Sequence, residues 1–346
     1  MEQLARADIQ GLKAAISPAR RLLVFLHDNP DPDAITAGWL LAKIAESLGK
    51  RASLVYGGRL GRAENRTMVK ALGIPLRHIG ARRIRYLNTD RYALVDTQPG
   101  TGNNSFPAER LRSHVVIDHH PSRAVAADFV DVRSEVGCCT TLLLGYHEAA
   151  GLVPDPDLAT AAAYAILSET QDLKREATRA DREAYQRIFP HVRLGVLGRI
   201  RHPVRSRSYF RTIARAMQRV QVGRNTCVCH MGGVDAAELV AELADLLAAM
   251  ERISWCLVSG LHGRQMVMSI RTNRACARAD RVIQRMIGKL GAGGGHDMIA
   301  GGSVDCGSAD QYPELAERMT ASFLRQIRRR QPERLRPLLS EALRAE

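Results

Sequence analysis

The sequence predicts an α/β fold, in which a mostly parallel sheet flanked by helices is followed by a second, smaller α/β domain. In the first half, short apolar runs alternate with segments of helical periodicity, which is the pattern of a parallel sheet. Acids and histidines follow several of these runs directly. The length of 346 residues, with a hydrophobic share of 45%, is sufficient for two domains with separate cores.

The first half contains four apolar runs that are bounded by turn residues and short enough to be strands. We expect these strands at 22–26, 52–56, 92–95 and 114–117. Between and after them, apolar residues recur at the spacing of one helix face. We expect the corresponding helices at 34–48, 63–72, 140–150, 156–168 and 179–189.

The pattern loosens around 190–208, where glycine, proline and arginine dominate. Beyond it, we expect strands at 226–230, 254–259, 265–270 and near 303–304, and helices at 236–250, 279–290 and 311–330. The expected organisation is a first domain at 1–195, a linker or connecting helix at 196–224, a second domain at 225–330 and a charged tail at 331–346.

The chain is strongly basic, with a net charge of +14 and a sequence pI near 9.9. Such a surplus favours polyanionic partners, namely nucleotides, nucleic acid or polyphosphate. Eight arginines and no acid lie between Pro190 and Val220, and a second cluster runs from Arg325 to Arg336. We interpret both clusters first as solvated faces and second as phosphate-steering surfaces.

The seven cysteines are scattered and form no CxxC pair, which indicates reduced thiols and argues against a disulfide framework or a zinc ribbon. The N-terminal residues have no apolar signal region, and no run approaches the ~18 apolar residues of a membrane span. We therefore expect a cytoplasmic protein with no membrane partner.

Four segments carry candidate metal ligands, and each follows an apolar run. In chain order they contain His27, Asp31 and Asp33; Asp96; Asp118, His119 and His120; and Glu169. Strand ends of a parallel sheet meet at one edge, so these side chains can converge in one crevice. Carboxylates with histidine suit Mn²⁺, and their number suits two ions, which is the site type of phosphoester hydrolysis. Aspartate is also a common turn and N-cap residue, which explains any one segment but not all four.

The ordered motifs HDNPDPD, LVDT, VIDHH and LSETQDL resemble those of the DHH-family phosphoesterases, which include the RecJ exonucleases. A later segment, GAGGGHDMIAGG, resembles the glycine-rich motif of the C-terminal domain associated with that family. The resemblance extends over about 20–325 and is to the two-domain, RecJ-like group of oligoribonuclease and small-nucleotide phosphodiesterases. It implies a DHH catalytic domain followed by a DHH-associated substrate-binding domain.

The resemblance also implies a role for each motif residue. One Mn²⁺ would be held by His27, Asp31 and Asp96, and the other by Asp33, Asp96, His119 and the acid of the fourth segment, with Mg²⁺ as an alternative ion. Asp118 would orient the neighbouring histidines. His120 would act near the scissile phosphate as a hydrogen-bond donor or proton-transfer group.

The fourth segment departs from the family pattern, which has aspartate where this chain has Glu169. Glutamate also binds hard cations, but its extra methylene displaces the carboxylate by ~1.5 Å. Either the backbone adjusts, or Asp172 substitutes, or the second ion binds weakly. We favour Glu169 as the ligand.

The predicted second domain would capture the substrate. Glycines allow backbone amides to approach an anion closely, and arginines pair with phosphate or carboxylate. The candidate substrate-binding residues are Arg271, Arg274, Gly293, Gly294, Gly295 and His296.

The expected function is that of a manganese-dependent phosphodiesterase or phosphatase with a two-metal in-line mechanism. The substrates implied by the resemblance are short oligoribonucleotides, linear dinucleotides or 3′-phosphoadenosine-5′-phosphate. The alternatives are an exopolyphosphatase or pyrophosphatase-like hydrolase, and a nucleotide- or nucleic-acid-binding protein with a weakened metal site. A homodimer is left open.

Overall fold

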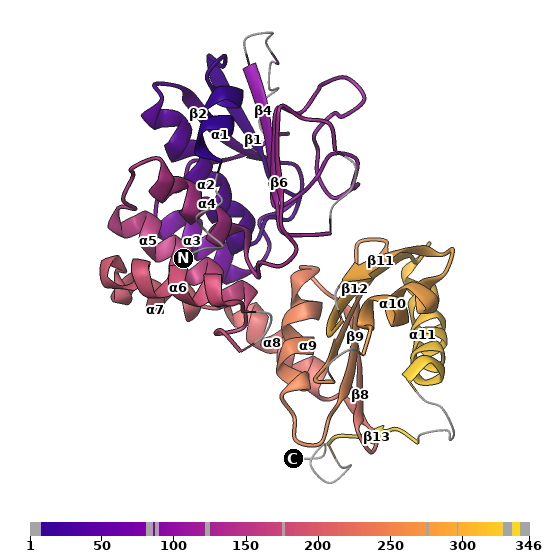
Figure 1. Cartoon of the computed structure of the whole chain (residues 1–346). Helices are drawn as coiled ribbons and strands as arrows, with labels where there is room; N and C mark the ends of the chain where they lie inside the picture. The colour runs from indigo at the N-terminus through magenta and orange to yellow at the C-terminus, as the bar shows by residue number, and fades with distance from the viewer. Residues whose placement is uncertain are drawn as a thin grey trace. The chain divides into compact units, whose positions relative to one another are not determined.

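The computed structural model of the chain describes residues 8–80, 86, 90–121, 125–174, 177–274, 277–295, 297–327 and 334–339. The chain forms two compact units that divide after Val204 (Figure 1). This division lies within the expected connecting segment 196–224, which itself contains a helix, α8, and a short strand, β7. His296 of the glycine-rich motif lies outside the described residues.

The first unit is built on a six-stranded, fully parallel sheet in the order β3-β2-β1-β4-β5-β6. Its strands are β1 (Arg21–Phe25), β2 (Arg51–Tyr56), β3 (Leu76–His78), β4 (Asp90–Val95), β5 (Val115–Asp118) and β6 (Phe129–Val132). Strands β2 and β3 lie on one side of β1, and strands β4, β5 and β6 lie on the other side of β1. The strand order therefore reverses between β1 and β4, which is where open α/β sheets bind ligands.

Helices cover one face of this sheet and share a large apolar cluster with it. Side chains along a strand alternate between the two faces of the sheet, and Leu22, Val24 and Leu26 lie on the face that the helices cover. These helices are α1 (Ile9–Ile16), α2 (Pro32–Ser47), α3 (Ala63–Ala71), α4 (Cys139–Ala149), α5 (Pro156–Glu169), α6 (Arg179–Ile188) and α7 (Leu194–Arg201). The opposite face carries a smaller cluster in which Phe106, from a loop, packs on Phe25 and Tyr92. The fold confirms the predicted α/β class.

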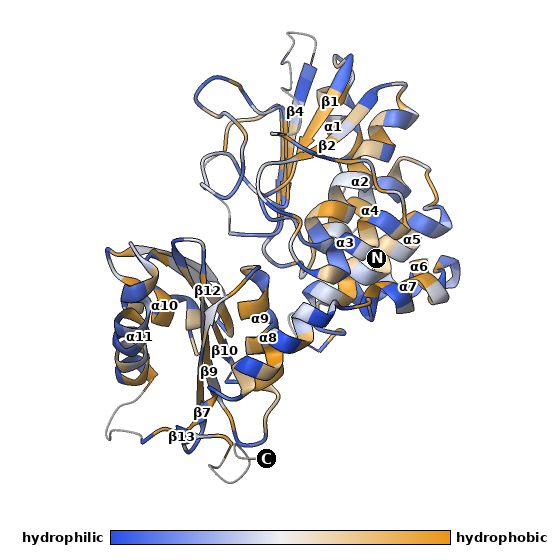
Figure 2. Cartoon of the chain, turned by 180° about the vertical axis from the view of Figure 1, so that it is seen from behind, coloured by the Kyte–Doolittle hydropathy of each residue, from blue (hydrophilic) through white to orange (hydrophobic). Residues whose placement is uncertain are grey.

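The second unit has a seven-stranded mixed sheet in the order β11-β12-β10-β9-β8-β7-β13, in which only β8 and β9 are parallel among the described strand pairs. Its elements are α8 (Arg207–Met217), β7 (Gln221–Val222), β8 (Thr226–Gly233), α9 (Glu238–Ala248), β9 (Trp255–His262), β10 (Gln265–Thr272), α10 (Ala279–Ile287), β11 (Gly291–Gly295), β12 (Ile299–Asp305), α11 (Tyr312–Ile327) and β13 (Arg336–Pro337). One face packs against α10 and α11, and the other against α8 and α9. Figure 2 shows the apolar strands between these helices.

Two local expectations need correction. The helix expected at 34–48 begins two residues earlier, because Pro32 and Asp33 form the first turn of α2. Proline is tolerated at that position because the first helical amide has no partner within the helix. The segment Gly293–Gly295 is an edge strand paired with β12. Within the described ranges, no helix is both long and apolar enough to cross a membrane.

Candidate metal centre

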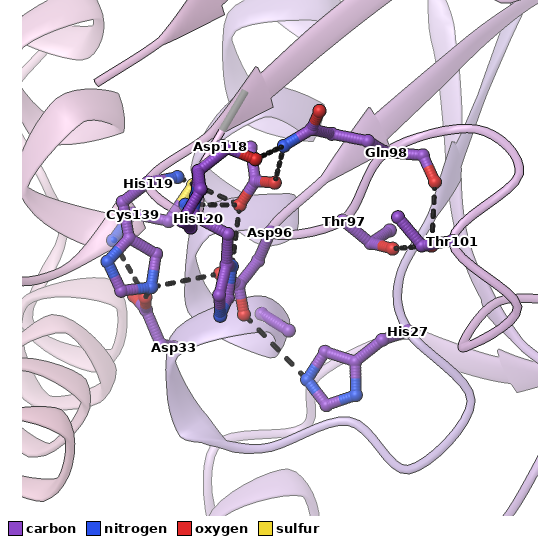
Figure 3. A network of polar contacts seen from close by, with 12 residues as sticks. His27, Asp33, Asp96, Thr97, Gln98, Thr101, Asp118, His119, His120 and Cys139 are labelled. Atoms are coloured by element: carbon purple, nitrogen blue, oxygen red, sulfur yellow. Dashed lines mark hydrogen bonds and ion pairs between the residues drawn. The ribbon is translucent and has the colours of Figure 1, made fainter. Parts of the chain in front are cut away.

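The motif residues of the first unit meet at the carboxyl edge of the parallel sheet. His27 follows β1, Asp96 follows β4, and His119 and His120 follow β5, so three neighbouring strands deliver them. Figure 3 shows the three histidines directed toward Asp96. The cluster lies beside the β1–β4 reversal, as the topology requires of a ligand site in such a sheet.

His27 and Asp31 form the first pair of candidate ligands. His27 Nε2 lies 3.6 Å from Asp31 Oδ2 and 3.7 Å from Asp96 Oδ2. The other oxygen of Asp31 accepts the Ala34 amide at 3.0 Å, so Asp31 is the N-cap of α2 as well as a site residue. One oxygen of Asp31 therefore caps α2, and the other oxygen faces the cluster.

Asp96 lies at the centre of the cluster and is 2% exposed. Its φ of 59° is in the left-handed region, which aspartate tolerates better than most residues, and this turn ends β4 at once. Asp96 Oδ1 is 3.3 Å from His119 Nε2 and 3.5 Å from His120 Nδ1. This buried oxygen has no hydrogen-bond partner among the described residues. A buried acceptor without a donor is the expected feature of a ligand whose cation is absent.

Asp118 holds the two histidines that follow it. Its Oδ1 accepts the backbone amides of His119 at 2.8 Å and His120 at 3.2 Å, and it is 2.8 Å from His120 Nδ1. Its Oδ2 accepts the amide of Gln98 at 2.7 Å. Burial opposes ionisation of Asp118, but the bonds from His120 and Gln98 lower its pKa. Asp118 is thus an anionic anchor beside the candidate ligands.

Asp33 reaches the cluster from the first turn of α2 and is 1% exposed. Both of its oxygens meet the N-terminus of α4: Oδ1 accepts the amide of Thr140 at 2.7 Å and Oδ2 that of Cys139 at 2.7 Å. His119 Nε2 lies 3.7 Å from Asp33 Oδ2. Each carboxylate oxygen has two lone pairs, so these amides leave acceptor capacity for a cation.

Glu169 is the last residue of α5 and interacts electrostatically with the acids of the cluster. Burial raises its pKa well above the usual value, and the charges of Asp31, Asp33 and Asp96 raise it further. Asp172, the alternative fourth acid, is exposed and pairs with Arg201 at 2.7 Å. The electrostatic interactions of Glu169, together with the exposure of Asp172, therefore favour Glu169 as the acid beside the cluster.

The electrostatics show that the cluster lacks positive charge. Burial raises the pKa of Asp96 well above its usual value, and the nearby Asp33 and Asp31 raise it further. Burial lowers the pKa of His27, but Asp31 and Asp96 outweigh it and raise that pKa to about 9. For Asp31, desolvation is outweighed by His27, and the pKa falls to about 2. In the absence of a cation, the crowded carboxylates thus favour the protonated forms of Asp96 and His27.

These residues fit two divalent cations that share Asp96. Two groups of candidate ligand atoms each lie within 4.8 Å of one another: His27, Asp31 and Asp96, and Asp96, His119 and His120. Ligands at about 2.1 Å from one ion, in octahedral geometry, lie about 3–4 Å apart, which matches the separations around Asp96. Oxygen with imidazole nitrogen is a donor set suited to Mn²⁺.

The predicted substrate residues belong to the second unit, and the structure describes five of the six. Arg271 is 7% exposed and donates to Asp245, Ser269 and the Ile270 carbonyl, so much of its donor capacity is used within the unit. Arg274 is exposed. Gly293 and Gly295 each lie so close to neighbouring atoms that a Cβ would clash.

Sequence analysis missed Gln98, which is 1% exposed and bonds both Asp118 and the Pro121 carbonyl. The backbone carbonyl of Gln98 accepts hydrogen bonds from Thr101 Oγ1 at 2.8 Å and from Asn104 Nδ2 at 2.9 Å. Its position two residues after Asp96 could have indicated a role in the site, because Gln98 follows the same end of β4 as Asp96. Its partner, 20 residues later in the chain, could not be read from the sequence.

The comparisons with known proteins agree with this geometry. Residues 21–167 match the DHH family, N-terminal domain. An uncharacterised protein of Methanocaldococcus jannaschii is 31% identical over 287 residues, which cover 83% of this chain and 58% of that protein. A Deinococcus radiodurans protein named "Probable manganese-dependent inorganic pyrophosphatase" is 32% identical over 181 residues, or 49% of this chain and 53% of the relative. The chain therefore spans less than two thirds of the length of these curated relatives.

A solved structure of an exopolyphosphatase-related protein from Bacteroides fragilis is similar in fold, with a TM-score of 0.72. That likeness covers 92% of this chain and 96% of the other at 13% sequence identity, so it extends over both units and concerns the fold alone. The family match confirms the resemblance that the motifs indicated. Residues 21–167, which lie within the first unit, therefore carry the N-terminal domain of the DHH family.

Proposed function

We propose that this protein is a manganese-dependent phosphoesterase that hydrolyses phosphoester bonds of small nucleotides. The observation that carries the proposal is the convergence of His27, Asp31, His119 and His120 on the buried carboxylate of Asp96, whose Oδ1 has no hydrogen-bond partner among the described residues. When bound, two divalent cations would activate water and stabilise the attacking and leaving oxygens of a phosphoryl centre. The family match supports this reaction class.

The residues around the cluster have separate tasks in this proposal. Asp31, Asp33, Asp96, Glu169 and the imidazoles of His27 and His119 hold the ions. His120 is the proton-transfer group: burial opposes its protonation, but the hydrogen bond of Asp118 and the charge of Asp96 raise its pKa. Asp118 fixes the His120 ring through Nδ1, so that a phosphate oxygen would meet a ring of set orientation.

The small-nucleotide assignment rests on the basic surface and on the second unit. A net charge of +14 favours polyanionic substrates. We propose that Arg274 and the segment Gly293–His296 contact the substrate. Arg271, with much of its donor capacity used by Asp245 and Ser269, would support that surface and contribute less direct contact than Arg274. Residues 1–195 and 225–330 remain our proposed domains, joined by 196–224 and followed by the tail 331–346.

Hydrolysis of inorganic pyrophosphate or polyphosphate is the second candidate. Its support is the 32% identity, over 181 residues, to a protein named as a manganese-dependent inorganic pyrophosphatase. The reaction would use the same cluster, because the attacked atom is again a phosphorus with charged oxygens. The two candidates differ in whether a nucleoside is recognised.

The test is a substrate panel assayed with Mn²⁺ and with Mg²⁺. It contains linear dinucleotides, oligoribonucleotides of two to twenty units, 3′-phosphoadenosine-5′-phosphate, pyrophosphate and polyphosphate. We expect release of mononucleotide or phosphate from nucleotides by the wild type and by Asp90→Asn, and none by Asp96→Asn. Turnover of pyrophosphate alone would establish the second candidate. Nucleotide binding without turnover of any phosphoester would refute the enzyme.

A further inference from the structure

Helix α8 of the second unit presents an unusual combination of charge and exposed aromatic surface. Its inner side is apolar: Ala216 is fully buried, and Tyr209, Ile213 and Met217 pack on the same cluster. These positions recur every three to four residues, so the opposite side of the helix faces outward. Figure 2 shows both hydrophilic and hydrophobic segments along α8.

The outward side carries arginine at every fourth position. Arg207, Arg211 and Arg215 are all exposed, and successive members are separated by about 6 Å along the helix axis. None of the three forms an ion pair with a carboxylate within the described part of the chain. Arg205, just before the helix, differs, because it pairs with Glu242 at 3.3 Å. The segment 190–224 contains no acid to neutralise these guanidinium groups.

An exposed aromatic ring stands beside the arginines. Phe210 is 62% exposed, so much of its aromatic ring is accessible to a ligand. Its ring is held in place by Tyr209, edge to face at 5.4 Å between centroids. The guanidinium of Arg205 lies 4.9 Å from the centroid of the Tyr209 ring. Phe210 is thus a supported, outward platform.

We propose that Arg207, Phe210, Arg211 and Arg215, the α8 arginine face, bind single-stranded nucleic acid. Unpaired arginines in a row attract the phosphates of one strand, and an exposed ring offers a surface on which an unpaired base can stack. A duplex buries its bases in its own stack and would leave Phe210 without a partner. The ring therefore distinguishes this ligand from a duplex and from inorganic polyphosphate, which share the charge alone.

The test is fluorescence anisotropy with labelled single strands of twelve nucleotides, both oligo-dT and oligo-U, at several salt concentrations. It uses the full chain carrying Asp96→Asn, without divalent cations, so that the probe is not consumed. Adding Arg211→Gln and Arg215→Gln should weaken binding about 25-fold at 0.1 M salt and make the salt slope less negative by about 1.4, from 0.7 per phosphate contact. The matched control, Arg264→Gln with Arg318→Gln, removes the same charge from exposed sites elsewhere in the unit and should keep the slope.

Phe210→Ala separates nucleic acid from other polyanions. We expect it to weaken single-strand binding about fivefold or more, with no change in salt slope, and to leave competition by polyphosphate or a duplex unchanged. If Phe210→Ala has no effect, or weakens polyphosphate equally, the face is a general polyanion surface and the inference is wrong. An unchanged slope in the double arginine variant also overturns it.

This inference stands apart from the proposed hydrolysis. In a background with intact Asp96, all α8 variants should hydrolyse a linear dinucleotide at the wild-type rate, which also shows that they are folded. Loss of single-strand binding with retained turnover supports the α8 arginine face. Retained binding with no turnover of the dinucleotide would contradict the nucleotide hydrolysis proposed above and leave the α8 arginine face in place.

Discussion

Replacing Asp96 with asparagine should have opposite effects on the metal-free and the manganese-loaded protein. Asp96 is buried, its Oδ1 lacks a donor, and its pKa is raised by burial and then by Asp33 and Asp31. Asparagine keeps the shape and is neutral at every pH, so it avoids both the repulsion of a buried charge and the cost of taking up a proton. Relief of a buried, unsatisfied carboxylate should stabilise the metal-free first unit by about 1 kcal/mol. For a unit of this size, that raises Tm by about 2–4 °C.

The same substitution should remove the stabilisation by manganese. At an ion concentration of 100 Kd, one site stabilises by about 2.7 kcal/mol, which is about 5–11 °C in Tm. If the loss of a shared ligand weakens Kd about 100-fold, the gain falls to RT ln 2, about 0.4 kcal/mol, or about 1–2 °C. Both values come from thermal unfolding followed by circular dichroism, with EDTA and with excess MnCl₂.

Asp90→Asn is the matched control, because it makes the same change at the other end of β4. Asp90 is equally buried, but its oxygens accept Arg21 Nε at 3.2 Å and Nη2 at 2.6 Å. Losing this pair should cost about 1.5–3 kcal/mol, or about 3–12 °C in Tm, while the gain with manganese persists. The assignment is refuted if Asp96→Asn destabilises the metal-free protein as Asp90→Asn does, or keeps the manganese gain.

Three further outcomes follow from the site. Glu169→Gln should weaken Mn²⁺ binding in isothermal calorimetry about tenfold or more, whereas Asp172→Asn, which only breaks a surface pair, should leave it unchanged; equal effects would contradict the choice of Glu169. In the metal-free protein, Tm should fall as pH rises from about 6.5 to 9, because protonated His27, whose pKa is raised to about 9, gives stability that is lost as its ring deprotonates. The gain in Tm with manganese should grow over the same range, and a flat Tm profile would contradict the raised pKa of His27. Gln98→Ala should lower kcat about tenfold with little change in KM, because the anchor of His120 loses a donor, and Gln98→Glu should not restore it, since a second carboxylate would face Asp118; an unchanged kcat would show that Gln98 only packs.

The sequence predicted four of the six described strands of the first sheet, together with the ligand edge, because both depend on local patterns; the short edge strands β3 and β6 were not predicted. His27, Asp96 and His119 each follow an apolar run, and parallel strand ends share an edge, so their meeting needs no other information. The roles of Gln98 and Arg271 depend on contacts made across the fold. Arg271 pairs with Asp245 of α9, which no periodicity indicates. An arginine directly after the strand expected at 265–270 therefore looked like a substrate contact, although Arg271 is mostly bonded to other residues of the second unit.

The Gly293–Gly295 segment shows a second limit of sequence reasoning. Glycine is usually evidence for a turn, and here three glycines lie in an edge strand. The reason is steric: a Cβ on Gly293 would lie 2.9 Å from the Ile287 side chain, and one on Gly295 would lie 2.2 Å from the Ile299 carbonyl. Gly295 is thus required where β11 packs against β12, Gly293 fits closely against Ile287 of α10, and a Cβ on Gly294 would meet no atom within 4 Å. That constraint acts between elements and leaves no local signature.

The candidate metal centre divides its acids into two kinds, and this division predicts that the fold does not depend on the ions. Asp31 caps α2, Asp33 accepts the first amides of α4, and Asp118 accepts those of His119 and His120. Backbone donors thus hold these three carboxylates in position. Asp96 and Glu169, whose pKa values are raised, depend on a cation for their charge. The far-ultraviolet circular dichroism of the EDTA-treated protein should therefore match that of the manganese-loaded protein at pH 6.5, and a loss of helical signal would show that the ions also build the edge of the sheet.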